Sequence, residues 1–378
     1  MREEERIDSL WLCSLPGIGP VSIRKLMEVA GSPKDALKLS EPSLRAILGE
    51  KRAECVRRGR TAGQRDLAAR RLENYRIRGI SFVPLWDESY PKRLRTLEDA
   101  PVAIYVKGRL PDGNAPAAAV IGARECSEYG KKAARYFARG LAAAGVVIVS
   151  GMARGVDGIA GSAALEVGGM SVAVLGCGVD VCYPPENRAL YERLEQDGCL
   201  LSEYRPGIRP ESRLFPPRNR IISGLSDLVL VTEARERSGT SITVDLALEQ
   251  GRDVFAGPGR ITDSCSCGCN RLIAAGAGIA LNVEQLLETM GRPAACSVLA
   301  AGKGQREKRG AEIPEKNGNF RKLVLETLDG DPRGLDELYE RLVARSGAEE
   351  ASLQDLMQEL VVLCMEGIAK NSAGRYFL

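Results

Sequence analysis

The chain has 378 residues, a hydrophobic fraction of 44% and a formal net charge of +3. This length exceeds one ordinary core and favours two or three folded domains, and the apolar content excludes a disordered protein. The chain contains no histidine, the commonest general base and metal ligand, which excludes Ser-His-Asp and Cys-His catalysis.

The sequence predicts a cytoplasmic protein. Its first residues carry acids where a signal peptide needs a basic region, and the longest apolar stretch, 141–149, is far shorter than the roughly 20 residues of a spanning helix. Eleven cysteines without paired spacing favour reduced thiols. Cys265, Cys267 and Cys269 lack a C-x-x-C spacing and an evident fourth ligand. We therefore expect no membrane span and no metal.

Residues 1–80 are predicted to form a helical N-terminal domain. The turn Leu15-Pro16-Gly17-Ile18-Gly19-Pro20 resembles the hairpin of a helix-hairpin-helix (SAM-like) domain, in which glycine amides approach a phosphate. A plain connection between two helices is the simpler interpretation of the same residues. The segment from Lys51 to Arg78 holds ten Lys and Arg against three acids. This end of the chain is therefore basic.

From about residue 117 the chain repeats strand and helix units. Short apolar runs, each followed by a Gly- or Pro-bearing loop and a helical stretch, predict an α/β fold with a parallel, Rossmann-like sheet buried on both faces. We assign residues 81–290 to this domain. The predicted strands are 118–121, 146–149, 172–175, 199–201, 227–232 and 253–256.

The C-terminal part is predicted to be a linker followed by a small domain. Residues 291–319 collect charge, Gly and Pro without periodicity, as a flexible linker does. In residues 320–378, leucines at i, i+3 and i+7 indicate helices, and a hairpin closed by Ala373-Gly374 completes a winged helix. Residues 351–365 contain Asp355 and Glu359 but no Lys or Arg, which favours a protein contact over duplex recognition.

Four of the loops that follow the predicted strands contain arginine. In an open parallel sheet, ligands bind beyond the carboxyl ends of the strands, so these loops should meet at one edge. Small residues let backbone amides approach an anion there, and arginines bind phosphate oxygens. We call these loops the phosphate rim. Their candidate DNA-binding residues are Gly122, Arg124, Ser150, Gly151, Arg154, Phe215, Arg218, Asn219, Arg220, Ser238, Gly239 and Thr240.

The anion is predicted to be a polymer rather than a cofactor. No G-x-G-x-x-G follows the first strand, and no G-x-x-x-x-G-K-[ST] occurs, which disfavours NAD and nucleotide triphosphates. Several arginines along one rim fit the successive phosphates of a single DNA strand, and Phe215 could stack a base. We expect no cofactor.

Carboxylates near the strand ends leave an enzymatic alternative. Asp157, Asp180, Glu203 and Glu233 could serve as acid or base groups in a nucleotide-processing Rossmann-type hydrolase, such as a phosphoribohydrolase. The P-G-G-x-G-T loop of that hydrolase family is absent. The simpler interpretation is that these carboxylates cap loop amides and pair with the nearby arginines.

Motifs along the central region resemble those of one family. They are Tyr90-Pro91, VIGAR (120–124), SGMARGVD (150–157), AVLGCGVDVCYP (173–184), FPPRNRIISGLS (215–226), SGTSIT (238–243), ALEQGRDVFAGPG (247–259) and GCNRLIAAGA (268–277). With these motifs the chain resembles the DprA family of DNA-processing proteins, also called Smf. The resemblance implies a helical N-terminal domain, an extended Rossmann fold and a C-terminal winged helix. It also implies a homodimer that binds single-stranded DNA without catalytic turnover.

The same resemblance implies a cellular role. It implies that the protein protects incoming single-stranded DNA and loads the RecA recombinase onto it during natural transformation, with single-strand-binding protein as a further candidate partner. The chain departs from the family pattern at Ala123, where serine is usual, and at Gly161, where histidine is usual. A catalytic histidine at position 161 is therefore excluded, and we expect no catalytic residues.

Overall fold

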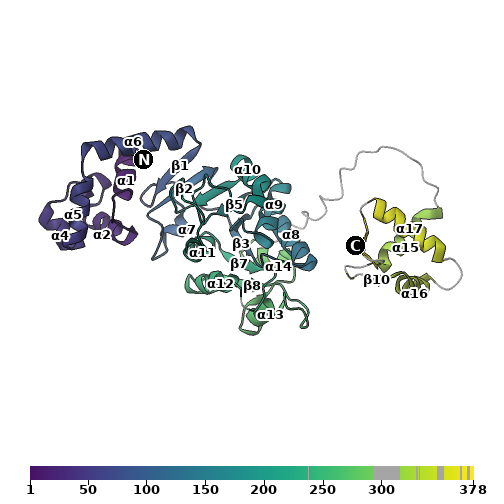
Figure 1. Cartoon of the computed structure of the whole chain (residues 1–378). Coiled ribbons are helices and arrows are strands. Elements are labelled where there is room, and N and C mark those ends of the chain that lie inside the picture. Colours follow the sequence, from purple (N-terminus) through teal and green to yellow (C-terminus); the bar gives the residue numbers. More distant parts are fainter. Residues whose placement is uncertain are drawn as a thin grey trace. The chain divides into compact units, whose positions relative to one another are not determined.

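The computed structural model describes residues 1–236, 238–292, 316–328, 331, 333–346, 353–366, 368–372 and 375–378. The chain divides into two compact units, Met1–Gly302 and Lys303–Leu378 (Figure 1). Most of the predicted linker, 291–319, and the predicted turn Ala373-Gly374 lie outside the described residues. Within the described residues, no helix combines the length and the hydropathy needed to cross a bilayer.

The first 77 residues are helical, as predicted. Hydroxyls cap three of the helices, because the side chains of Ser32, Ser40 and Thr61 each accept the amide three residues onward. A core of leucines, including Leu12, Leu26 and Leu44, holds the helices together. The helices are α1 (Glu3–Cys13), α2 (Pro20–Ala30), α3 (Pro33–Ala36), α4 (Glu41–Leu48), α5 (Glu50–Gly59) and α6 (Ala62–Ile77).

One mixed sheet follows, and it contains every strand that the sequence predicts. In spatial order its strands are β1-β2-β6-β5-β4-β3-β7-β8-β9, and the pairs from β6 to β9 are parallel. The antiparallel edge strands β1 and β2 and the short β9 are additional to the prediction. The strands are β1 (Ile80–Pro84), β2 (Ala103–Gly108), β3 (Ala117–Ile121), β4 (Val147–Ser150), β5 (Ser171–Val174), β6 (Cys199–Ser202), β7 (Leu228–Val231), β8 (Asp253–Ala256) and β9 (Gly278–Ile279).

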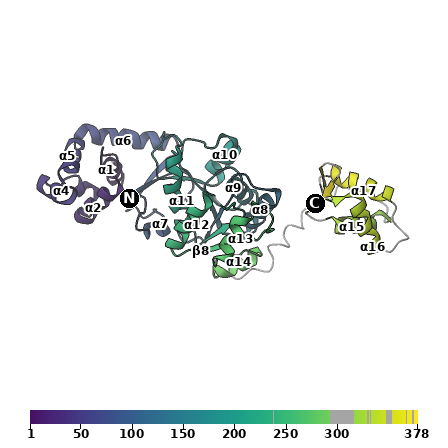
Figure 2. The ribbon, with the colours of Figure 1, turned by 60° about the horizontal axis from the view of Figure 1, so that its bottom comes forward.

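Helices cover both faces of this sheet (Figure 2). Along β3 the side chains alternate, so that Ala118 and Val120 join one buried cluster while Ala119 and Ile121 join the other. Burial on both faces explains why the parallel strands read as continuous apolar runs. The covering helices are α7 (Lys92–Arg95), α8 (Glu128–Ala143), α9 (Val156–Glu166), α10 (Arg188–Asp197), α11 (Phe215–Gly224), α12 (Thr240–Glu249), α13 (Cys267–Ala274) and α14 (Val283–Thr289).

The helical region and the sheet form one compact unit, and the division predicted at residue 80 falls inside it, between α6 and β1. Polar contacts join the two parts. Arg78 pairs with Asp180 in the loop after β5, and Arg6 of α1 pairs with buried Asp87 at a distance of 3.4 Å. Each of these contacts connects the helical region to a loop of the sheet region.

The second unit has the elements predicted for a winged helix. Its core contains Val324, Leu338, Leu342, Leu356 and Leu360. The predicted leucine spacing therefore marks buried helix faces. The elements are α15 (Lys316–Thr327), α16 (Leu335–Ser346), α17 (Leu353–Met365) and an antiparallel sheet of β10 (Arg333–Gly334), β12 (Arg375–Phe377) and β11 (Lys370–Ser372).

We predict that a chain ending after Gly302 unfolds at the same temperature as the large unit of the full chain, because each unit has a hydrophobic core of its own. Calorimetry of both chains should show main transitions within about 2 °C of each other. A main transition lowered by more than about 5 °C would show that the C-terminal unit stabilises the rest.

Candidate nucleic-acid interface

The loops at the carboxyl edge of the parallel strands enclose a cavity of about 680 Å³. Residues from the predicted phosphate rim line most of it, although they are spread over more than a hundred positions of the chain. The structure therefore brings together nine of the twelve candidate residues. They are Gly122, Arg124, Arg154, Phe215, Arg218, Asn219, Ser238, Gly239 and Thr240.

Three candidate residues do not line this cavity. Ser150 is buried and its hydroxyl donates to the Val120 carbonyl at 2.8 Å. The Gly151 amide donates to Asp157 Oδ2 at 3.0 Å. Arg220 is also buried, and its guanidinium pairs with Glu203 at 2.9 Å and with Asp99 at 2.8 Å. The prediction that Ser150 and Arg220 lie on the open rim is therefore corrected. Gly151 lines a smaller pocket that shares Arg124 and Arg154 with this cavity.

Arg218 lines the cavity but is only 5% exposed. Its Nη1 donates to the carbonyls of Gly151, at 3.0 Å, and Val174. Its acidic neighbour is Asp157, whose side chain is also buried and approaches the same side of Gly151. A Cβ on Gly151 would come within 2.7 Å of Asp157 Oδ2 and 2.8 Å of Arg218 Nη1, so only glycine leaves room for this pair.

The buried pair has opposing electrostatic influences. Burial raises the pKa of Asp157, while the Arg218 guanidinium and the Gly151 amide act to lower it. Burial likewise lowers the pKa of Arg218, and the Asp157 carboxylate opposes this change. Each charge therefore compensates for the desolvation of the other, and Arg218 is mainly a structural residue of the cavity floor.

Arg124 differs from Arg218 because it is exposed to solvent. Among the described residues, no carboxylate forms an ion pair with Arg124, whereas Arg154 pairs with Glu186 and Arg235 pairs with Glu125 at 3.7 Å. Backbone hydrogen bonds hold its loop, since the Ala123 amide donates to the Glu233 carbonyl at 2.8 Å. Arg124 is thus an exposed cation that lines the cavity from a loop held by backbone hydrogen bonds.

A glycine allows two rim loops to touch. Gly155 has a φ of +72°, and a Cβ there would lie 2.2 Å from the Ala123 carbonyl oxygen. The Val156 amide also donates to that oxygen, at 3.2 Å. The loops after β3 and β4 are therefore locked together, which places Arg124 close to Arg154 on the cavity wall.

The carboxylates of the enzymatic alternative stabilise loops, as the simpler interpretation predicts. Glu233 is 1% exposed and accepts hydrogen bonds from the amide and the hydroxyl of Ser127, which caps α8. Asp180 accepts the Gly207 amide at 2.8 Å, and Glu203 pairs with Arg220. Neither Glu203 nor Glu233 lines the cavity.

Tyr183 lines the cavity and was missed by sequence reasoning. Its ring stacks on the Phe215 ring, with a centroid distance of 5.6 Å and an interplanar angle of 29°. The guanidinium carbons of Arg124 and Arg218 lie 6.0 and 5.9 Å from the Phe215 centroid. The position of Tyr183 after the third predicted strand could have indicated it. It was overlooked because the loop after that strand contains no arginine.

The cysteines do not form a metal site in the part of the chain that is described. Cys269 is buried and its Sγ donates to the Val231 carbonyl at 3.6 Å. Cys265 and Cys267 are half-buried. Alternate spacing at the start of α13 gives the three thiols different surroundings.

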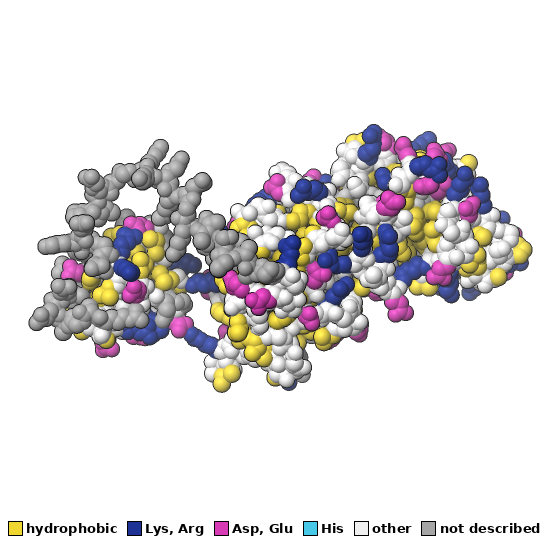
Figure 3. Space-filling model, turned by 180° about the vertical axis from the view of Figure 1, so that it is seen from behind, with side chains coloured by type: hydrophobic (Ala, Val, Ile, Leu, Met, Phe, Trp, Pro, Cys, Tyr) yellow, Lys and Arg dark blue, Asp and Glu magenta, His cyan; other side chains and the backbone are white. Residues whose placement is uncertain are grey.

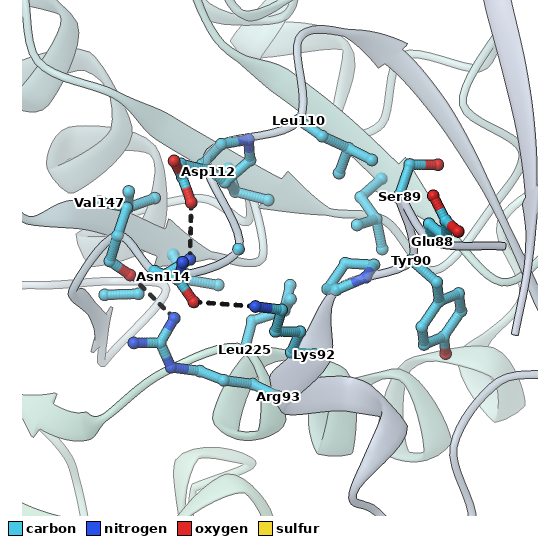
Figure 4. A pocket seen from close by; sticks show the side chains of 18 residues that line it. Glu88, Ser89, Tyr90, Lys92, Arg93, Leu110, Asp112, Asn114, Val147 and Leu225 are labelled. Carbon is cyan, nitrogen blue, oxygen red and sulfur yellow. Dashed lines mark hydrogen bonds between the residues drawn. The ribbon is translucent and has the colours of Figure 1, made fainter. Parts of the chain in front are cut away.

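A second cavity, of about 320 Å³, lies at the amino edge of the same strands (Figure 4). Its floor is apolar and includes Val147, Val172 and Leu201. The cations at its mouth are already paired, since Lys92 Nζ donates to Asn114 Oδ1 at 3.2 Å and Arg93 pairs with Asp227 at 2.8 Å. This cavity is therefore less suited to a phosphate than the cavity of the rim.

The predicted basic segment forms exposed helix faces on α5 and α6 (Figure 3). Lys51, Arg52 and Arg70 are exposed there, while Arg57 and Arg76 pair with acids on their own helices. Exposed cations spread along helices add long-range attraction for a polyanion. These cations do not show whether the turn at residues 15–20 is a helix-hairpin-helix hairpin or a plain connection.

Comparisons with known proteins match the region that contains the phosphate rim to one family. The family model described as DNA recombination-mediator protein A matches residues 81–291. DNA processing protein DprA of Streptococcus pneumoniae is 46% identical over 201 residues, which are 53% of this chain and 71% of that relative.

Solved structures agree with this match. The X-ray structure of DprA from Streptococcus pneumoniae has a TM-score of 0.65 and 36% identity, covering 76% of this chain and 98% of that chain. A structure of DNA processing protein A from Helicobacter pylori, described for its single-stranded DNA binding mode, has a TM-score of 0.51 and 33% identity and covers 56% of this chain and 95% of that chain. The α/β fold, the motifs and the matched region together show that the chain belongs to the DNA recombination-mediator protein A family, DprA.

Proposed function

We propose that this protein binds single-stranded DNA along the phosphate rim and acts as a recombination mediator without catalysing a reaction. The observation that carries the proposal is the single cavity in which separate loops gather an exposed arginine, hydroxyls and stacked aromatic rings. The relative from Helicobacter pylori, described for its single-stranded DNA binding mode, supports the same ligand class.

The start of α12 is the second phosphate contact that we propose. Four helices, α8, α9, α11 and α12, begin at the rim. Ser127 caps α8, and α9 carries Asp157 in its first turn. The first turn of α11 contains Pro216 and Pro217, which have no amide donor. Helix α12 has Gly239 before it, Thr240 at its start and no acid in its first turn. Its amides and the hydroxyls of Ser238 and Thr240 can therefore receive a phosphate.

A non-enzymatic role follows from the carboxylates of the cavity. Among the described lining residues these are Glu125, which is exposed beside Arg235, and Asp157, which is buried against Arg218. Neither is positioned as a free acid or base group. The hydrolase alternative therefore has less support than binding.

We further propose that the protein acts as a homodimer that loads RecA recombinase onto incoming single strands, including strands coated by single-strand-binding protein. The family resemblance supports this role. The rim occupies one edge of the sheet, which leaves other surfaces for protein partners. Two rims on one strand would also strengthen binding, because the second contact becomes intramolecular.

We predict that Arg124→Ala weakens binding to oligothymidylate and flattens the dependence of log affinity on log salt by about 0.7 per lost phosphate contact. Fluorescence anisotropy at several salt concentrations measures both quantities. The matched control is Arg139→Ala, an exposed arginine on α8 that does not line the cavity. Equal slopes for the two variants and the unchanged protein would contradict the assignment of Arg124.

Arg218→Ala should act on stability, because it leaves the Asp157 carboxylate buried without its cation. We expect the free energy of unfolding in urea to fall by about 3–5 kcal/mol. Arg124→Ala should change it by less than about 0.5 kcal/mol. If Arg218→Ala is as stable as Arg124→Ala, the guanidinium is not the structural partner of Asp157.

The loading role predicts a shorter lag in RecA-dependent ATP hydrolysis on single strands coated with single-strand-binding protein. The intact protein should shorten the lag, and Arg124→Ala should do so less. Binding of DNA with an unchanged lag would disprove loading and leave single-strand binding intact.

A further inference from the structure

The aromatic pair of the cavity has one enclosed ring and one open ring. Phe215 is half-buried, and a Cβ on Gly176 would lie 2.5 Å from its Cδ1, so the backbone after β5 packs against this ring. Arg124, Arg218 and Tyr183 contact it as well. Phe215, which the sequence suggested as a base-stacking residue, is therefore partly enclosed by protein.

Tyr183 is 42% exposed and lies at the cavity wall. The segment that carries it is fixed at both ends. The Tyr191 hydroxyl donates to the Val179 carbonyl at 2.7 Å, and Asn187 Nδ2 donates to the carbonyls of Met152 and Ala153 at 3.0 and 3.1 Å. The Tyr183 ring is thus held in position before any ligand binds, which lowers the entropy lost on binding.

We infer that Tyr183 is the surface on which an unpaired base stacks, with Phe215 supporting it from behind. This inference rests on the proposed function. A flat exposed ring beside the phosphate-binding Arg124 can receive the base of a nucleotide whose phosphate contacts the arginine. Bases of a duplex are paired and stacked on one another, so Tyr183 favours single strands. Stacking on a ring also tolerates any base, as a recombination mediator requires.

The ring, rather than the hydroxyl, is expected to matter. No hydrogen bond within the described residues fixes the Tyr183 hydroxyl, whereas the stacking contact with Phe215 involves the ring alone. Tyr183→Phe should therefore retain its affinity for single strands, and Tyr183→Ala should bind them more weakly. This pair of variants separates stacking from hydrogen bonding.

The test compares Tyr183→Ala, Tyr183→Phe and the unchanged protein on oligothymidylate and on the same backbone without bases. We expect Tyr183→Ala to bind oligothymidylate about 10-fold more weakly and the abasic strand equally well. Its salt slope should stay unchanged, because no phosphate contact is removed. The matched control is Tyr136→Ala, a 44% exposed tyrosine on α8 outside the cavity, which should bind both strands normally.

Tyr183→Trp adds a direct readout. The native tryptophans, Trp11 and Trp86, lie outside the cavity, so the added indole reports on this position by difference. Its fluorescence should be quenched by oligothymidylate and not by the abasic strand. Circular dichroism of every variant checks that the fold is retained.

Two results would overturn the inference. Equal losses of Tyr183→Ala on both strands would mean that the ring positions the loop and does not stack a base. Unchanged oligothymidylate affinity in Tyr183→Ala, with binding by the unchanged protein, would exclude Tyr183 and leave the proposed function standing. If the unchanged protein fails to bind single strands, the proposed function falls together with this inference.

Discussion

The buried charges of Asp157 and Arg218 both lie against Gly151, in the space that a Cβ there would fill, and the architecture of the phosphate rim depends on their mutual compensation. Asp157 comes from α9 and Arg218 from α11, while Gly151 follows β4. A single pair therefore connects two helices and a strand end at the carboxyl edge of the sheet. Removing either charge would leave the other buried without compensation, which is far more costly than losing an exposed ion pair.

The arginines of the rim differ in their exposure to solvent. Arg218 and Arg220 face inward, where they bind carbonyls and carboxylates and fix α11 against the sheet. Arg124 faces the solvent on a loop held by backbone hydrogen bonds. Because the inward arginines keep the loops rigid, Arg124 can contact a phosphate with little loss of loop entropy.

The proposed phosphate contacts and ring stacking would give binding without sequence preference. Every nucleotide offers a phosphate and an aromatic face, whereas base edges carry the sequence information. The rim presents cations, helix amides and the Tyr183 ring, all of which recognise features common to every nucleotide. Such a surface suits a member of a recombination-mediator family, which must accept strands of any sequence.

The amino-acid sequence by itself determined the parallel sheet, because strands buried on both faces appear as short apolar runs between loops. It also determined which loops meet, because parallel strands bring their carboxyl ends to one edge. The antiparallel β1 and β2 were not apparent, since they precede the repeated units and lie at the edge of the sheet. Only the tertiary structure decided which arginines are buried. The partners of Arg220, Asp99 and Glu203, are remote in sequence, and burial depends on such neighbours in space. The same reason applies to Tyr183, because its stacking contact with Phe215 joins residues 32 positions apart in the chain.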